Sequence, residues 1–328
     1  MISRLTVFIV ITAWIHLQPS CLLAQRPEDS LLAAAKQGDA DLVRSLLQQK
    51  VNPNHAGSVV NAHDKLGFTA LTWAAAKGHT DIVRILLDHG ADIHVKSNDG
   101  WTVLMWAAIR GNASVVDFLI TRGASVNEKT SQGLTALMLA SRAGQTEALK
   151  ILLARGAHVN AVAADGNTAL ILASENGNPA AVKVLLEQGG DVHAKNNDGL
   201  TPLIMAAING NIAVAEVLLA TKAGVDAQDS GGLTAVHFAV SLDRVPTLKL
   251  LLDHGANPNH QTKDGDTPLM LAVAGGNPEM VKMLLAKGAD VSLRDKDGLT
   301  ALALAKTNQQ TEIIRLLESA IQQHKNDK

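Results

Sequence analysis

Hydrophobic and polar residues alternate in one pattern that returns at a fixed distance along the chain. In residues 67–99, an apolar run over Leu71–Ala76 is stopped by Gly78. A second run over Asp81–His89 carries apolar residues at helical spacing and ends before Gly90. Each run is too short to form a stable helix alone, so we predict two short helices that pack side by side. A glycine followed two residues later by threonine marks each unit, 33 residues apart, at Gly67, Gly100, Gly133, Gly166, Gly199, Gly232, Gly265 and Gly298.

The opening of each unit resembles that of the ankyrin-repeat family. The sequence Thr-Pro-Leu begins the helical run at Thr201 and Thr267, and Thr-Ala-Leu stands at Thr69, Thr135, Thr168 and Thr300. The family's histidine is present only in Thr234–His237, so we expect altered side-chain hydrogen bonding at the other openings and an unchanged fold. The resemblance covers nearly the whole chain after the leader. It implies an all-α ankyrin-repeat solenoid of helix-turn-helix units with finger turns.

The repeat boundaries divide the chain into four parts. We predict a signal peptide over 1–24, a divergent N-terminal capping repeat over 25–66, seven 33-residue repeats over 67–297, and a C-terminal capping repeat with a polar tail over 298–328. The first repeat carries seven surplus residues within 52–64. They form either a binding loop or a tolerated surface insertion, and the small cost of loop length favours the insertion. No residues remain for a separate catalytic domain.

The leader has the features of a secretory signal peptide. Arg4 precedes an apolar run over Leu5–Leu17, and Leu22-Leu23-Ala24 offers a small residue for cleavage. An uncleaved anchor is the alternative, although the run is shorter than the roughly 20 residues that span a bilayer. A lipoprotein signal at Cys21 is a weaker alternative. We expect a bacterial-type exported protein, periplasmic or secreted, that is not inserted in the membrane after cleavage.

Composition narrows the chemistry of the mature chain. Cys21 is the only cysteine, and the leader carries one arginine and no acid, so cleavage after Ala24 leaves 28 Lys and Arg against 31 Asp and Glu. This balance does not favour nucleic-acid binding. Metalloprotease, phosphate-loop and nucleophile-elbow motifs are missing from the sequence. His94 and His193 occupy equivalent positions, but three repeats separate them, or about 30 Å at the usual helix spacing, so they cannot share a metal ion. We predict no cofactor, no metal and no enzymatic activity.

Two repeats lack a glycine where the others have one. Between the helices, Asp243 replaces the glycine found at equivalent positions, and after the second helix Lys222 does so. If these positions need a positive φ, each substitution costs about 1 kcal/mol. We therefore predict that Leu218–Pro246 is the least stable interior segment.

Aromatic residues identify a candidate binding face. Trp73 and Trp106 align with apolar helix positions and are predicted to be structural, whereas Phe68 and Trp101 follow the turn glycine and are predicted to be partly exposed. In the ankyrin family, this finger position and the end of the first helix line the concave surface. By that resemblance the helix-end residues are Ala76, Lys77, Ile109, Arg110, Arg142, Ala143, Glu175 and Asn176. The candidate partner-binding residues are Phe68, Lys77, Trp101, Ile109, Arg110, Leu134 and Arg142. The rings form either a binding hot spot or a packing contact between neighbouring fingers.

We therefore predict a monomeric scaffold that binds a protein partner through its concave face. One alternative is an inhibitor or protector of an enzyme in the same compartment, and another is a secreted effector. A hydrolase of envelope polymers is a third alternative, for which the sequence offers no catalytic dyad.

Overall fold

A computed structural model of the chain describes residues 27–48 and 59–326. The predicted signal peptide and the surplus residues up to 58 lie outside these ranges. Over the described residues the protein consists of helix pairs, and the prediction of an all-α solenoid is confirmed. The first helices of the pairs are α2 (Pro27–Gln37), α5 (Ala70–Lys77), α7 (Val103–Ile109), α9 (Ala136–Arg142), α11 (Ala169–Glu175), α13 (Pro202–Asn209), α15 (Ala235–Ser241), α17 (Pro268–Ala274) and α19 (Ala301–Thr307). The second helices are α3 (Ala40–Gln48), α6 (Thr80–Asp88), α8 (Ala113–Thr121), α10 (Thr146–Ala154), α12 (Pro179–Glu187), α14 (Ile212–Ala220), α16 (Val245–Asp253), α18 (Pro278–Ala286) and α20 (Thr311–Asn326).

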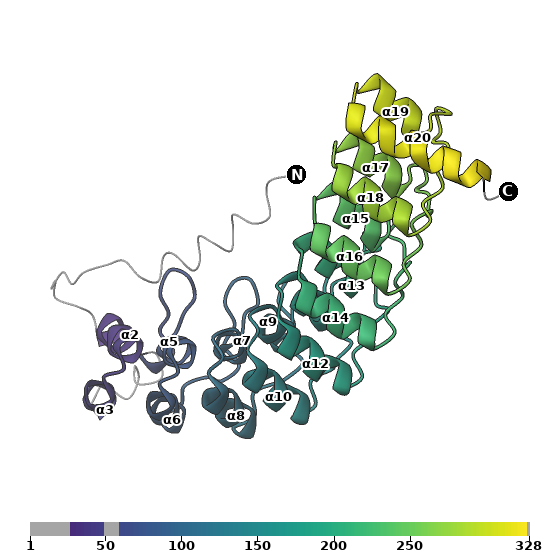
Figure 1. The fold of residues 1–328 in the computed structure, drawn as a ribbon. Coiled ribbons are helices and arrows are strands. Elements are labelled where there is room, and N and C mark those ends of the chain that lie inside the picture. The colour runs from purple at the N-terminus through teal and green to yellow at the C-terminus, as the bar shows by residue number, and fades with distance from the viewer. Residues whose placement is uncertain (1–26, 49–58, 327–328) are drawn as a thin grey trace.

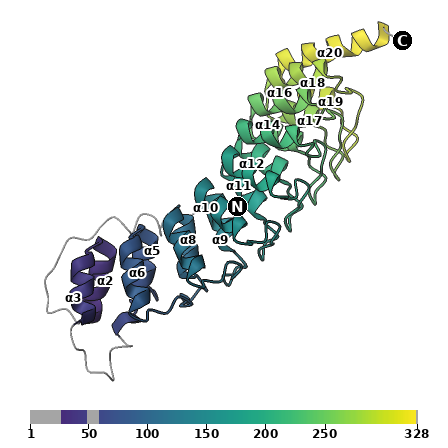
Figure 2. The ribbon, with the colours of Figure 1, turned by 90° about the horizontal axis from the view of Figure 1, so that it is seen from below.

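The helices form two layers that run the length of the molecule (Figure 1). Each first helix packs on its own second helix and on the first helices of the neighbouring repeats, with a neighbour on one side only for α2 and α19. The first helices approach one another more closely than the second helices do, so the stack is curved, as Figure 2 shows from below. We call the first helices the inner layer and the second helices the outer layer.

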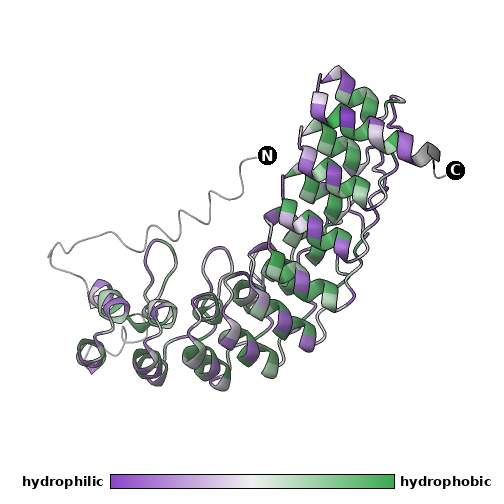
Figure 3. Ribbon diagram, viewed as in Figure 1, coloured by the Kyte–Doolittle hydropathy of each residue, from purple (hydrophilic) through white to green (hydrophobic). Residues whose placement is uncertain are grey.

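The core lies between the two layers and between successive repeats. Equivalent leucines recur in it, such as Leu71, Leu104 and Leu137 in the inner layer and Leu119 and Leu152 in the outer layer, and each is at most 1% exposed. Full burial of such a side chain contributes about 1.5 to 3 kcal/mol. Figure 3 shows hydrophobic residues on the facing sides of the helices and polar residues on the outer layer's surface.

A threonine caps the inner helix in nearly every repeat. The Oγ1 of Thr102 accepts a hydrogen bond from the backbone N–H of Met105, and Thr135 and Met138 form the same pair. The backbone N–H of Thr102 points at the sulfur of Met105, 3.4 Å away. In Thr234 the acceptor of that N–H is instead Nδ1 of His237, at 3.2 Å. At the openings of Thr102 and Thr135 methionine sulfur thus takes the place of the ring nitrogen, while the threonine cap is kept. His237 Nε2 also lies 3.4 Å from the carbonyl oxygen of Asp266 in the next finger.

Asparagines bridge consecutive repeats after the second helix. Asn127 Nδ2 donates to the carbonyl of Gly156 at 3.0 Å, and its Oδ1 accepts from the N–H of His158 at 2.9 Å. Asn61, Asn160 and Asn259 form the same bridges.

His94 and His193 stand at the equivalent position in two repeats, and a small pocket opens beside each, about 20 Å³ at His94 and about 170 Å³ at His193.

The two predicted positive-φ sites are present. Lys222 has φ 61° and Asp243 has φ 55°, in a region that L-residues seldom adopt. A third such residue is Gln309, with φ 56°. It stands where most other repeats have a glycine, but we did not predict it. Asp243 is tied to the next repeat because Asn277 Nδ2 donates to its carboxylate at 2.6 Å.

Candidate binding face

Four aromatic rings from two repeats form one continuous row. Trp73 stacks on Phe68 with ring centroids 5.0 Å apart, and Phe68 lies 4.8 Å from Trp106 of the next repeat. Trp106 in turn stacks on Trp101 at 4.4 Å. These distances are favourable for aromatic pairs. The aromatic row, defined as Phe68, Trp73, Trp101 and Trp106, therefore joins two fingers to two inner helices.

The rings of the aromatic row differ in exposure. Trp106 is 8% exposed, which confirms its predicted place in the core. Phe68 and Trp101 are half-buried, as expected for finger residues that still present a ring edge to solvent. Trp73 is also half-buried, more exposed than predicted, because small Ala33 stands at its position in the preceding repeat. The amine of Lys36 in α2 covers this ring, 4.5 Å from its centroid. The two interpretations of the rings thus coexist, since the rings pack on each other and remain partly accessible.

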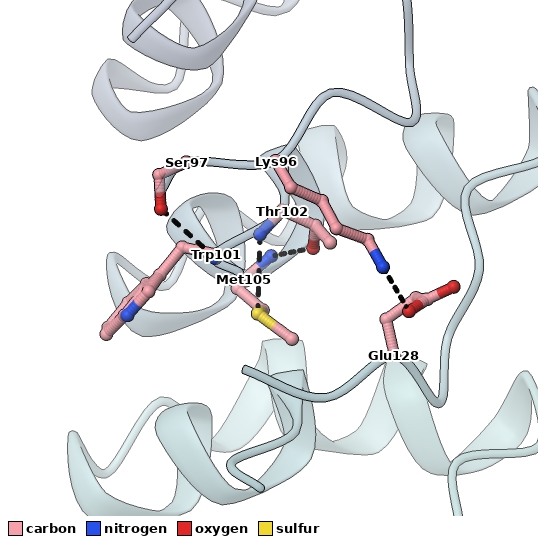
Figure 4. Close-up of polar contacts among 6 residues, drawn as sticks. All are labelled: Lys96, Ser97, Trp101, Thr102, Met105 and Glu128. Atoms are coloured by element: carbon pink, nitrogen blue, oxygen red, sulfur yellow. Dashed lines mark hydrogen bonds and ion pairs between the residues drawn. The ribbon is translucent and has the colours of Figure 1, made fainter. Parts of the chain in front are cut away.

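The two indole N–H groups on the inner helices differ in their hydrogen bonding. Trp73 Nε1 donates to the carboxylate of Asp64 in its own finger at 3.2 Å. Trp106 Nε1 is buried and has no hydrogen-bond partner in the part of the chain that the structure describes. The residue equivalent to Asp64 is Ser97, whose shorter side chain accepts from the backbone N–H of Trp101 at 3.1 Å (Figure 4). An unsatisfied buried donor of this kind costs about 1 to 3 kcal/mol.

Cations follow the aromatic row along the ends of four inner helices. Lys36, Lys77 and Arg110 are exposed, and Arg142 is half-buried. Among the described residues, Lys36, Lys77 and Arg110 belong to no ion pair. In the next repeat Glu175 occupies the position of Arg142. Burial raises the pKa of Glu175, and the charge of Arg142 opposes that shift.

The predicted site residues fall into two groups. Phe68, Trp101, Ile109 and Arg110 lie on or beside the aromatic row, as does Lys77 at the end of α5. Leu134 differs from the expected partial exposure: it is 5% exposed because this shorter side chain is part of the continuous hydrophobic core. On the finger, Trp101 and Lys96 point to opposite sides, and Lys96 pairs with Glu128 at 2.7 Å (Figure 4).

Sequence reasoning missed one contributor to this face. Lys36 lies in the divergent first repeat, where the surplus residues obscure the register. Counting from Gly38, the turn glycine of that repeat, places Lys36 at the position of Ala76. That count would have added it to the row of cations.

Residues 27–48 and 59–326 contain no group of three or more His, Cys, Asp or Glu side chains placed to hold a metal ion. None of the helices in the same ranges has the length and apolar character needed to cross a membrane. His237 is fully buried, and burial lowers its pKa to about 4, so this ring is neutral at pH 7.

Comparison with known proteins gives the same kind of repeat along the chain. The family model described as ankyrin repeats (three copies) matches residues 31–130, 90–163, 115–196, 170–262 and 246–327. Among curated proteins, palmitoyltransferase akr1 of Schizosaccharomyces pombe is 41% identical over 71 residues, which cover 21% of this chain and 10% of that protein. BCL-6 corepressor-like protein 1 of Mus musculus is 42% identical over 72 residues, 22% of this chain and 4% of that protein. DNA-binding protein RFXANK of Homo sapiens is 36% identical over 80 residues, 24% of this chain and 28% of that protein. The matched stretches thus span less than a third of these relatives, and the similarity is local to the repeats.

Proposed function

Because the chain belongs to the ankyrin-repeat family, we propose that it is a non-catalytic interaction protein that binds a protein partner through the inner layer and the fingers. In this proposal the binding face is the aromatic row with the cations beside it. The protein is an exported monomer that forms a stoichiometric complex with its partner.

One observation carries the choice of face. Phe68 and Trp101 are each partly exposed, and their rings pack against Trp106 with centroids 4.8 and 4.4 Å away, the first tilted and the second stacked. A ring held in place by other rings loses little conformational entropy when a partner covers it, which is the property of a hot-spot residue. Exposed Lys77 and Arg110 stand beside it on the inner helices and add directional contacts.

The proposed export rests on the leader alone. The apolar run over Leu5–Leu17 and the small residue Ala24 support cleavage before Gln25. N-terminal sequencing of the protein from cell fractions tests this. We expect Gln25 as the first residue outside the cytoplasm, and Met1 on a membrane-bound form would contradict the proposal.

The proposed binding face is tested by comparing two equivalent finger positions. Trp101 stands in the second 33-residue repeat and Leu299 at the equivalent place in the C-terminal capping repeat, where Leu299 is 40% exposed. Full-length mature protein is used to capture partners, which are identified by mass spectrometry, and each variant's affinity is then measured. Trp101→Ala should weaken binding by about 2 kcal/mol, or roughly thirtyfold. Leu299→Ala should leave binding unchanged.

The reverse result would contradict the proposal. If Trp101→Ala binds as tightly as the unmodified protein while Leu299→Ala loses the partner, the binding face lies at the other end of the stack. Because Trp101 stacks on Trp106, its truncation should also lower the unfolding free energy by about 1 kcal/mol. Binding is therefore compared at a temperature where both variants are fully folded.

A further inference from the structure

We infer that the segment bound by this face is acidic and extended, with an apolar side chain that covers the aromatic row. This inference rests on the proposed function and adds the chemical class of the partner. Its basis is a set of exposed cations, Lys36, Lys77 and Arg110, at the ends of consecutive inner helices beside the aromatic row.

The cations are spaced regularly. Lys36, Lys77, Arg110 and Arg142 stand at the ends of α2, α5, α7 and α9, which pack on one another in that order. Packed helices lie about 8 to 10 Å apart, so the four positions extend over roughly 30 Å. An extended chain rises about 3.3 Å per residue, and a segment of about nine residues would therefore contact all four.

The charges of Lys36, Lys77 and Arg110 are available to a ligand. Lys77 and Arg110 are exposed, and neither side chain forms a hydrogen bond or ion pair with another described residue. Lys36 lies over the ring of Trp73, a contact that leaves ammonium donors free for a carboxylate. Arginine pairs with carboxylates through two parallel hydrogen bonds, which favours glutamate or aspartate over a neutral side chain as its partner.

The remaining repeats show where the acidic segment ends. At the equivalent helix-end positions of α11, α13, α15, α17 and α19 no cation recurs, and Lys306, one residue earlier in α19, pairs with Glu318 at 3.0 Å. Those positions hold Glu175, Asn176, Ile208, Asn209, Ser241, Leu242, Ala274, Gly275, Thr307 and Asn308. In the last fingers acids and bases nearly balance, since the acids Asp264, Asp266, Asp295 and Asp297 stand among the bases Lys263, Arg294 and Lys296. A negatively charged segment is therefore attracted to the first four repeats more than to the last ones.

Two other occupants are compatible with cations beside aromatic rings. Carboxylates of a second copy would join two molecules through this face. A single-stranded nucleic acid would stack its bases on the rings. The chain's excess of acids over bases disfavours nucleic acid. One set of binding titrations can distinguish the three occupants.

Fluorescence anisotropy with labelled peptides of about ten residues tests the inference on the full mature chain. One peptide carries glutamates around a central leucine, a second has glutamine in place of every glutamate, and a third has lysine. The acidic peptide should bind at least about tenfold more tightly than the glutamine peptide, and the advantage should shrink between about 50 and about 200 mM salt. Lys77→Gln and Arg110→Gln should each weaken it roughly fivefold. The control Lys183→Gln, an exposed cation on outer helix α12, should have no effect.

Four results would overturn the inference. They are failure of the acidic peptide to bind, equal affinity for the glutamine peptide, tighter binding of a short oligothymidine, and a concentration-dependent dimer that Arg110→Gln dissolves. If the glutamine peptide binds equally well and Trp101→Ala abolishes that binding, the acidic class is wrong while the proposed binding face stands. If Trp101→Ala has no effect on a captured protein partner, the proposed function itself fails.

Discussion

Residues 67–142 and residues 201–274 have the same backbone but different side chains at the same positions. The first stretch carries the aromatic row and the cations, and all of its turn positions with positive φ are glycines. The second carries the single histidine at a repeat opening and two non-glycine residues with positive φ, Lys222 and Asp243. The repeated positions maintain the stack in both, so the positions that vary decide what each part does. We propose that the first part binds the partner, and we expect the stability of the second part to depend on pH and on backbone strain.

Truncation of Trp106 should give the largest effect and sharpen this contrast. The ring is 8% exposed and stacks on two others, so Trp106→Ala should lower the unfolding free energy by about 3 to 5 kcal/mol. Leu271 occupies the equivalent position in α17 and is only partly buried. Leu271→Ala should cost about 2 kcal/mol. Denaturant unfolding curves measure both values, and equal losses would mean that the aromatic row adds nothing to the stack.

His237 should make the second stretch sensitive to acid. Its pKa is about 4 in the folded chain and near 6.5 when unfolded, so protonation favours the unfolded state. The stabilising contribution is complete above pH 6.5 and is lost as the pH falls from 6.5 to about 4, amounting to about 3 kcal/mol.

The matched variant is His237→Met, since methionine stands at the equivalent positions 105, 138 and 270. The difference in unfolding free energy between the two proteins, measured from pH 7 to pH 4, isolates the histidine from other titrating groups. Parallel curves would show that His237 has an ordinary pKa.

Ser97 offers a smaller test within the first stretch. Asp64 satisfies the indole N–H of Trp73, and the equivalent Ser97 leaves that of Trp106 without a partner. Ser97→Asp should supply the missing acceptor and raise the unfolding free energy by about 1 kcal/mol. Ser97→Ala, which removes the bond to the Trp101 N–H, is the control and should destabilise the protein. If Ser97→Asp also destabilises the protein, the indole N–H of Trp106 is satisfied in another way.

The repeat frame could be predicted from sequence because a 33-residue period fixes each position several times over. The positive φ of Lys222 and Asp243 followed from the glycines at their equivalents. The site was harder to predict because its contacts join different repeats. The stacking of Phe68 on Trp106 depends on the distance between a finger and the next helix. Lys36 was missed because its repeat departs from the period, and the burial of Leu134 depends on packing that an exposed-finger pattern does not show.

Lys222 and Asp243 should respond differently to glycine, although both have positive φ. Lys222→Gly removes backbone strain and no side-chain hydrogen bond or ion pair among the described residues, so it should raise the unfolding free energy by about 1 kcal/mol. Asp243→Gly also removes the hydrogen bond from Asn277, which offsets the gain and should leave stability nearly unchanged. Thermal unfolding of the two variants measures the difference, and a larger gain for Asp243→Gly would show that the bond to Asn277 contributes nothing.

Hydrogen exchange of the mature protein, alone and with its captured partner, tests the central claim that the N-terminal half of the inner layer is the binding face. We predict slower exchange on binding in α5, α7 and α9 and in the finger over residues 97–101. Exchange in α15, α17 and α19 should be unchanged. Protection centred on those three helices, or on the outer layer, would contradict the account.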